Sequence, residues 1–241
     1  MVDQQNSPPP IGRQERRYEL SWTWLSAAMG CHTALEEIGS GYVLRFIDFE
    51  KPWPVDDFAL NPNQKVPTLV DRSPQQTGMK PTHGPAGHTV VIYQSAAILL
   101  YLADNHPESG LIPTLGSAAR GHCYQWLFFM AEMLQPSYHM FYYPERHTTQ
   151  DDAASHQAVQ SRAIAWIDDI WQRLDRAVGK GAYFLGDEFS VCDLYMLPMA
   201  SWNESDRQFA SMDGYSNLSR ILSNIRSRPS VQRMIAAHTT G

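Results

Sequence analysis

The spacing of apolar side chains in the first fifty residues changes from the period of a strand to that of a helix and back. Large apolar residues occupy every second position over residues 18–24, which predicts a strand. Residues 26–38 predict a helix, with Ser26 as its N-cap and Gly39 as its end. Residues 42–48 are rich in aromatic and β-branched side chains, which is typical of a second strand. This order favours a parallel pair of strands joined by a right-handed crossover.

The next fifty residues alternate between proline-rich and apolar segments. Three prolines within residues 50–64 predict an irregular stretch with at most one short helix. Apolar runs at 68–70 and 89–93 predict two short strands, and the glycine- and proline-rich segment between them predicts a flexible loop that joins them as a hairpin. Residues 95–105 then predict a helix. The first half therefore has the order β-α-β followed by β-β-α.

The rest of the chain has the pattern of helices. Residues 106–116 contain two prolines and two glycines, which predicts a linker. Ser117 is placed to cap a long helix, and Ser190 with Asp193 has the pattern of a capping box at the start of a later one. The last helical stretch is interrupted at Pro229.

These elements predict two domains and a tail. Residues 18–105 form an α/β domain, residues 106–116 the linker and residues 117–241 an all-helical domain. We expect residues 1–17 to be a disordered tail, because their prolines and polar side chains can bury little apolar surface.

Composition and charge exclude several classes of protein. The chain has 241 residues, of which 43% are hydrophobic and 18% charged, and its net charge is −6. The negative charge argues against a nucleic-acid partner, and no apolar run predicts a membrane partner or a secretory signal. Cys31, Cys123 and Cys192 are far apart in sequence, so they predict neither a metal site nor a disulfide framework. We therefore expect a cytoplasmic protein without a bound metal.

Three local motifs, in their order and spacing, carry a resemblance to a known family. They are NPNQKVPTLVD at 61–71, YQSAAILLYLAD at 93–104 and FLGDEFSVCDLYMLP at 184–198. Each resembles a segment of the soluble glutathione S-transferases, and the resemblance extends over residues 18–237. It implies a thioredoxin-like α/β N-terminal domain followed by an all-α C-terminal helical domain, with glutathione as co-substrate and a homodimer as the assembly.

The resemblance also implies a glutathione site. The Val66–Pro67 bond is expected to be cis, so that the Val66 backbone can pair with the cysteinyl part of glutathione as an added strand would. Ser95 begins a helix, where free N–H groups favour an anion, and matches the position that holds the γ-glutamyl carboxylate. Gln94 stands where many relatives have an acid, and its amide oxygen can accept a hydrogen bond from the ligand's ammonium group. Lys65 matches a lysine near the glycine carboxylate in some classes, or is simply an exposed lysine.

Glutathione chemistry needs a donor that stabilises the thiolate. The family places this donor at the end of the first strand or the start of the first helix. Ser26 is the expected catalytic donor, with Thr23 as the alternative, although a plain N-cap role for Ser26 stays open. Cys31 lies too far along the helix to match the cysteine-bearing classes and is expected to be a buried structural residue. His32 is expected at the surface or in packing, so we expect no catalytic pair.

The second substrate is expected between the two domains. Tyr124, Phe128, Met130 and Met133, with the aromatic segment 137–143, suit an adaptable apolar substrate pocket. The same side chains also suit helix packing or a dimer seam.

The resemblance implies transfer of glutathione to an electrophilic, apolar small molecule, as in detoxification. The alternative enzymes are a glutathione-dependent isomerase or disulfide reductase. Gln94-Ser95 resembles the zeta class, which isomerises maleylacetoacetate, but that class has Ser-Ser-Cys where this chain has Leu25-Ser26-Ala27. A non-catalytic glutathione-binding or interaction protein of the same fold is the third possibility.

Overall fold

Four strands form one mixed sheet in the order β2-β1-β3-β4. The structure, a computed structural model, describes residues 17–72 and 90–239. β1 (Tyr18–Trp22) and β2 (Tyr42–Phe46) are parallel, whereas β3 (Thr68–Asp71) pairs antiparallel with both β1 and β4 (Val90–Tyr93). The parallel pair and the hairpin confirm the predicted topology. The loop expected between β3 and β4 lies outside the described residues.

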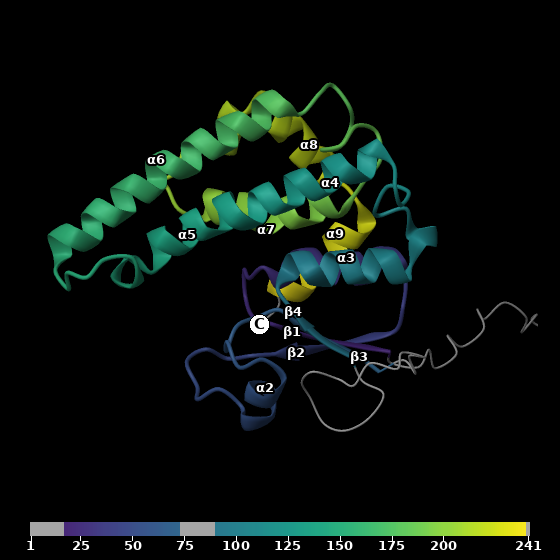
Figure 1. Cartoon of the computed structure of the whole chain (residues 1–241), viewed down its shortest axis with the longest axis horizontal. Coiled ribbons are helices and arrows are strands. Elements are labelled where there is room, and N and C mark those ends of the chain that lie inside the picture. The colour runs from purple at the N-terminus through teal and green to yellow at the C-terminus, as the bar shows by residue number, and fades with distance from the viewer. Residues whose placement is uncertain (1–16, 73–89, 240–241) are drawn as a thin grey trace, which may run out of the picture.

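Helices lie on both sides of this sheet. α3 (Ser95–Asn105) lies between the sheet and the helical half, and the short α2 (Val55–Leu60) lies on the opposite side (Figure 1). α1 (Ala28–Ile38) packs against α3 and β1, so it shares the layer of α3. The bounds of α3 are those predicted, and so is the short helix within the proline-rich stretch.

The second half of the chain is helical. Its longer helices are α4 (Ala118–Phe129), α5 (Gln135–Tyr142), α6 (Ala153–Ala177), α7 (Val191–Ser205), α8 (Ser216–Arg226) and α9 (Pro229–Thr239). Its shorter turns are η1 (Pro107–Ser109), η2 (Met130–Leu134), η3 (Pro144–Arg146) and η4 (Met212–Gly214). No helix in the described ranges is long and apolar enough to cross a membrane.

The predicted helix starts in this half are confirmed. The Ser117 hydroxyl accepts a hydrogen bond from the Arg120 N–H at 3.1 Å and so caps α4. Ser190 and Asp193 make both hydrogen bonds of a capping box at the start of α7. The last two helices meet at Pro229, where the sequence predicts an interruption.

The helix that follows Ser117 continues without a break to Tyr142. α4 continues through η2, which is a turn of π-helix, and then directly into α5. Pro136 lies at the start of α5 and has no backbone N–H, so the regular α-helical ladder lacks a donor there. The change in hydrogen-bond pattern falls immediately before this proline, as π turns inside helices commonly do where the ladder is disturbed.

The start of the first helix also differs from the prediction. β1 ends at Trp22, and the N-cap of α1 is Ala27 rather than Ser26. The Ser26 hydroxyl instead donates to the Thr23 carbonyl at 2.8 Å, and Leu25 has a φ of +49° in the left-handed region. A serine that bonds to nearby backbone competes with helix formation. A short loop therefore separates strand from helix, and it contains both candidate donors.

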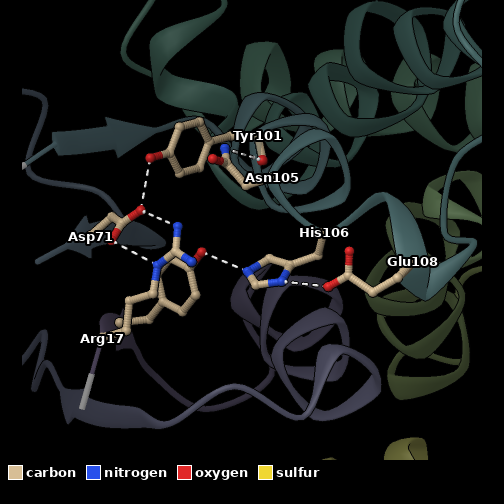
Figure 2. Close-up of polar contacts among 7 residues, drawn as sticks. Arg17, Asp71, Tyr101, Asn105, His106 and Glu108 are labelled. Carbon is tan, nitrogen blue, oxygen red and sulfur yellow. Dashed lines mark hydrogen bonds and ion pairs between the residues drawn. The ribbon is translucent and has the colours of Figure 1, made fainter. Parts of the chain in front are cut away.

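Arg17, the last residue of the predicted tail, is instead part of the folded domain. Figure 2 shows it donating to both carboxylate oxygens of Asp71, at 3.1 and 3.0 Å. The Tyr101 hydroxyl of α3 donates to the same carboxylate at 2.8 Å. Because Asp71 is fully buried, these partners compensate for the desolvation of its charge. Residues 1–16 lie outside the described residues.

A second chain of hydrogen bonds ties β1 to the linker. The Tyr18 hydroxyl lies 2.9 Å from His106 Nε2. His106 Nδ1 in turn lies 3.1 Å from a Glu108 carboxylate oxygen (Figure 2). Tyr18 is fully buried in the sheet, so this contact fixes where the chain leaves the first domain.

The two domains meet where α1 packs against α7. A Cβ atom built on Gly30 would lie 2.3 Å from the carbonyl oxygen of Leu194. Pro198, four residues further along α7, has no N–H to donate to that carbonyl. The Leu194 carbonyl therefore lacks its usual helical partner and faces α1, where only glycine leaves room for it.

A charged contact holds α1 to α9. Arg228 donates to both carboxylate oxygens of Glu37, at 2.8 and 2.7 Å, and its guanidinium lies 4.1 Å from the ring centroid of Phe189. Such two-pronged pairs fix orientation as well as distance. α1 is thus held by two elements of the helical domain, α7 and the start of α9.

Replacement of Gly30 tests this domain contact. Gly30→Ala should lower the free energy of unfolding by about 1–3 kcal/mol, because the added methyl group overlaps backbone that cannot rotate away. The matched control is Gly121→Ala in α4, where a Cβ meets nothing within 4 Å, and which should raise stability by about 0.5–1 kcal/mol through helix propensity. Urea denaturation measures both. Equal stability of the two variants would contradict the close approach.

Candidate functional site

The register of the strands brings three chain segments to one end of the sheet. Thr68 pairs with Ser21 on one side and with Tyr93 on the other. The Thr68 N–H donates to the Ser21 hydroxyl at 2.8 Å, which fixes this alignment. The segments that follow β1, precede β3 and follow β4 therefore lie together at this end of the strands. We call this end of the sheet the edge. These segments contain the predicted residues Ser26, Lys65, Val66, Pro67, Gln94 and Ser95.

The N-terminus of α3 is open at this edge. Gln94, its N-cap, has a φ of +76° and makes no side-chain capping hydrogen bond among the described residues. A glutamine in this conformation is strained, and such strain persists only where the surrounding structure enforces it. Ser95, the first residue of the helix, is 6% exposed. The first N–H groups of α3 therefore lack a side-chain cap, which is the arrangement that favours an anion.

The segment before β3 presents an unpaired stretch of backbone. The Val66–Pro67 bond is cis, as the resemblance implies. The buried Asn61 side chain donates to the Lys65 carbonyl at 2.8 Å and to the Thr68 hydroxyl at 3.0 Å, so it holds the turn from both sides. Within the described ranges, no hydrogen bond is made by the backbone N–H or carbonyl of Val66. An extended peptide can pair with these groups.

The loop between β1 and α1 carries both candidate thiolate donors. The Ser26 hydroxyl accepts weakly from the Ala28 N–H, at 3.4 Å, while donating to the Thr23 carbonyl. The Trp202 indole of α7 donates to the Leu25 carbonyl at 2.5 Å. The helical domain therefore holds this loop in place, and the sequence gives no local sign of that contact because the two residues are 177 positions apart.

α5 borders the same edge from the helical domain. Tyr138 packs edge-on against the Trp202 ring, with centroids 5.6 Å apart. Burial lowers the pKa of His139 in α5, and the positive charge of Lys65, in the segment before β3, lowers it further. The Tyr195 hydroxyl of α7 donates to the Gln135 side chain and also interacts with Ser95. Sequence reasoning missed Trp202, Tyr195 and Gln135, because nothing in their local pattern marks them.

Two of the residues predicted for the substrate pocket, Tyr124 and Phe128, lie in the first half of the long helix. Arg120 donates to the Tyr124 hydroxyl at 2.7 Å and also pairs with Asp104 near the C-terminal end of α3. Asp104 is nine residues beyond Ser95, about 14 Å along the helix. The structure therefore does not bring Tyr124 together with Ser95 and Ser26. The Phe128 ring is 49% exposed on α4.

The other residues considered from sequence are mostly interior. Met130 is fully buried in the core, whereas Met133 is half-buried. Cys31 is a fully buried free thiol, as predicted. His32 is 1% exposed, which fits a packing role, and its Nε2 lies 2.9 Å from the Tyr42 hydroxyl. Burial lowers the pKa of His32 to about 4.

The acidic and metal-binding side chains are scattered. Within residues 17–72 and 90–239, no group of three or more histidine, cysteine, aspartate or glutamate side chains could hold a metal ion. The edge presents the hydroxyl groups of Ser26 and Ser95, the backbone of Val66 and the N-terminus of α3.

Comparisons with known proteins decide the family. The family model for the N-terminal domain of glutathione S-transferases matches residues 26–105, and the model for their C-terminal domain matches residues 131–238. The chain belongs to the glutathione S-transferase superfamily.

Relatives of this transferase superfamily match most of the chain. Glutathione S-transferase GstA of Escherichia coli O157:H7 is 20% identical over 215 residues, which is 88% of this chain and 94% of that one. Disulfide-bond oxidoreductase YfcG of Escherichia coli strain K12 is 26% identical over 200 residues, 81% of this chain and 83% of that one.

A solved structure confirms the predicted fold. A glutathione transferase homologue from Sulfitobacter, crystallised with bound glutathione, superposes with a TM-score of 0.75 at 19% identity over 92% of this chain and 98% of that one. The thioredoxin-like α/β domain followed by the all-helical domain is therefore the transferase fold.

Proposed function

We propose that this protein is a glutathione S-transferase that transfers glutathione to an electrophilic, apolar small molecule. The observation that carries the proposal is the open N-terminus of α3 beside the unpaired backbone of Val66. An anion binds at the first and an extended peptide pairs with the second. Glutathione has both features, because its γ-glutamyl end carries a carboxylate and its cysteine lies in an extended chain.

The ligand's ends are assigned to residues of the edge. The γ-glutamyl carboxylate binds the N–H groups at the start of α3 and the Ser95 hydroxyl. The amide oxygen of Gln94 accepts a hydrogen bond from the neighbouring ammonium group. The Val66 backbone pairs with the cysteinyl part, and Lys65, which is exposed, attracts the glycine carboxylate.

This orientation directs the ligand's sulfur toward the loop between β1 and α1. Ser26 is the proposed donor to the thiolate. Its hydroxyl bonds to the Thr23 carbonyl in the free protein, and rotation about one side-chain bond redirects it. Thr23 lies in the same loop and is the alternative donor. The N-terminus of α1, which begins at Ala28, adds a favourable dipole for the negative sulfur.

The second substrate is proposed to lie against α5 and the loop. Trp24 and Leu25 are 42% and 47% exposed there, and residues 137–143 contribute further aromatic side chains. Phe128 lies in α4, which continues into α5, and it remains a proposed pocket residue. Tyr124 is not, because its hydroxyl is engaged with Arg120 at the far end of α3.

Disulfide reduction is the second candidate activity. It is favoured by the match to a relative named as a disulfide-bond oxidoreductase. A bound glutathione thiolate can attack a disulfide as well as an electrophilic carbon. Assays with an aryl halide and with a small mixed disulfide separate the two, and failure of both with retained glutathione binding would favour a non-catalytic protein.

We further propose a homodimer that acts in detoxification in the cytoplasm. Three unpaired thiols fit a reducing compartment. Phe49 and Val55 expose large apolar side chains, and we propose that a partner subunit covers them. A monomeric mass by light scattering would refute the dimer.

Replacement of Ser95 tests the placement of the carboxylate. Ser95→Ala should weaken glutathione binding about tenfold or more, because it removes a hydrogen bond to a charged group that contributes about 1.5–3 kcal/mol. Calorimetric titration measures the affinity. Ser117→Ala is the matched control, since it removes a serine at another helix N-terminus and should lower stability by about 1 kcal/mol without changing affinity. Unchanged affinity in Ser95→Ala would place the carboxylate elsewhere.

Replacement of Ser26 tests the thiolate donor. Ser26→Ala should raise the pKa of the bound thiol toward its free value, because the hydrogen bond favours the charged form. Turnover at neutral pH should fall while affinity changes little. Thiolate absorbance followed against pH measures this shift. A shift in Thr23→Val but not in Ser26→Ala would assign the role to Thr23, and no shift in either would leave the backbone N–H groups and the α1 dipole as the only stabilising groups.

A further inference from the structure

Two of the three cysteines lie side by side in the helical domain. The sulfur of Cys192, in the first turn of α7, is 3.8 Å from the sulfur of Cys123 in α4 and 3.4 Å from the Cys123 carbonyl oxygen. Both residues are fully buried. They are 69 positions apart in sequence, so their spacing gives no sign of the pair and only the fold brings them together.

The surroundings of Cys123 favour its thiolate. The hydrogen bond from the Cys192 thiol and the positive charge of Arg120 outweigh burial and the negative charge of Asp193, so the pKa of the Cys123 thiol is lowered. Arg120 is itself held, because it donates to the Tyr124 hydroxyl at 2.7 Å and to the Pro113 carbonyl at 3.1 Å. Hydrogen bonding to Cys123 and burial raise the pKa of the Cys192 thiol. Cys123 is therefore the better nucleophile of the two.

Cys31 has a different environment. Its sulfur lies 3.7 Å from the Ser95 carbonyl oxygen, and burial raises the pKa of its thiol. It has neither a positive neighbour that favours its thiolate nor a second cysteine beside it, since the other two cysteines contact each other. The same chain thus contains a matched pair and an isolated thiol of equal burial.

We propose that Cys123 and Cys192 are a modification site for a small peroxide, which converts them into a disulfide between α4 and α7. The Cys123 thiolate attacks one oxygen of hydrogen peroxide, the O–O bond breaks, and a sulfenic acid forms while the released hydroxide takes up a proton to become water. The Cys192 sulfur then attacks the sulfenic sulfur. The S–O bond breaks, and the leaving hydroxide takes the proton of the Cys192 thiol. Two thiols and one peroxide give one disulfide and two waters.

Burial of both sulfurs restricts the size of the oxidant that can reach them. The sulfurs must move from 3.8 Å to about 2.05 Å, a change that side-chain rotation and a small shift of α7 can supply. A peroxide is small enough to enter when these helices open briefly. Glutathione disulfide is much larger, so a mixed disulfide with glutathione is disfavoured at this position. The site does not depend on the proposed transferase activity.

The disulfide has a structural consequence. It closes a loop over the 69 positions between the two cysteines, which restricts the unfolded chain and stabilises the helical domain. The oxidised protein should therefore melt several degrees above the reduced protein, and dithiothreitol should return it to the lower melting temperature.

The test treats the full folded chain with hydrogen peroxide and then alkylates the remaining thiols after denaturation. The reduced protein has three alkylatable thiols. The oxidised monomer should retain one, with a mass lower by about 2 Da for the two hydrogens lost, and a non-reducing peptide map should join the peptides that contain Cys123 and Cys192. Cys31→Ala should lose two thiols in the same way.

Serine variants of Cys123 and Cys192 cannot form the disulfide and serve as controls for the wild-type protein. Cys123→Ser should leave both remaining thiols alkylatable, whereas Cys192→Ser should stop at a Cys123 sulfenic acid that dimedone traps. Neither variant should show a rise in melting temperature. The peptide map of the wild-type protein decides the question even if either variant fails to fold. Retention of all three thiols, a linkage that includes Cys31, or sulfinic and sulfonic acids without a disulfide would overturn the proposal.

Discussion

The close backbone contact between α1 and α7 is the constraint on which the site depends. The Leu194 carbonyl lacks a helical donor because of Pro198, and it faces α1 at Gly30, where no Cβ fits. This contact sets how closely the helical domain packs against the α/β domain. From there the same helix reaches Ser95 through Tyr195 and the Leu25 carbonyl through Trp202. One interhelical contact thus positions two of the three segments that form the edge.

The edge itself is built from groups that the fold leaves without partners. Among residues 17–72 and 90–239, no side chain caps the start of α3, and Gln94 adopts a positive φ that glutamine does not favour. The Val66 backbone is unpaired within the described residues, although Asn61 fixes the residues on either side of it. Ser117, Asp152 and Ser190 cap the starts of α4, α6 and α7, whereas α1, which also begins at this edge, has no side-chain cap from its N-cap Ala27. The uncapped start of α3 and the Val66 backbone support the proposal that a ligand binds at this edge.

Much of the fold could be predicted from the sequence, because its signals are local. The periods of the strands, the end of α1 at Gly39 and the capping box at Ser190 follow from neighbouring residues. The π turn before Pro136 and the continuous helix through Pro198 could not be predicted, since a proline within a sequence reads as a break. Tertiary packing decides in both places that the helix continues.

Some parts of the candidate site could be predicted from local motifs, and others could not. The segments at Val66 and Ser95 are contiguous motifs, and their placement follows from strand register. Trp202, Gln135 and the pair of Cys123 with Cys192 are contacts between residues distant in sequence, which a single chain without its fold does not reveal. The loop at Ser26 could be predicted only in part. The sequence indicates the position of Ser26, but it does not show that its hydroxyl donates a hydrogen bond to the Thr23 carbonyl.

A crystal structure with glutathione bound tests the central claim most directly. The account predicts the γ-glutamyl carboxylate at the first N–H groups of α3, the cysteinyl backbone paired with Val66, and the sulfur within hydrogen-bonding distance of the hydroxyl of Ser26 or Thr23. Glutathione bound away from this edge, or bound with its carboxylate distant from Ser95, would contradict it.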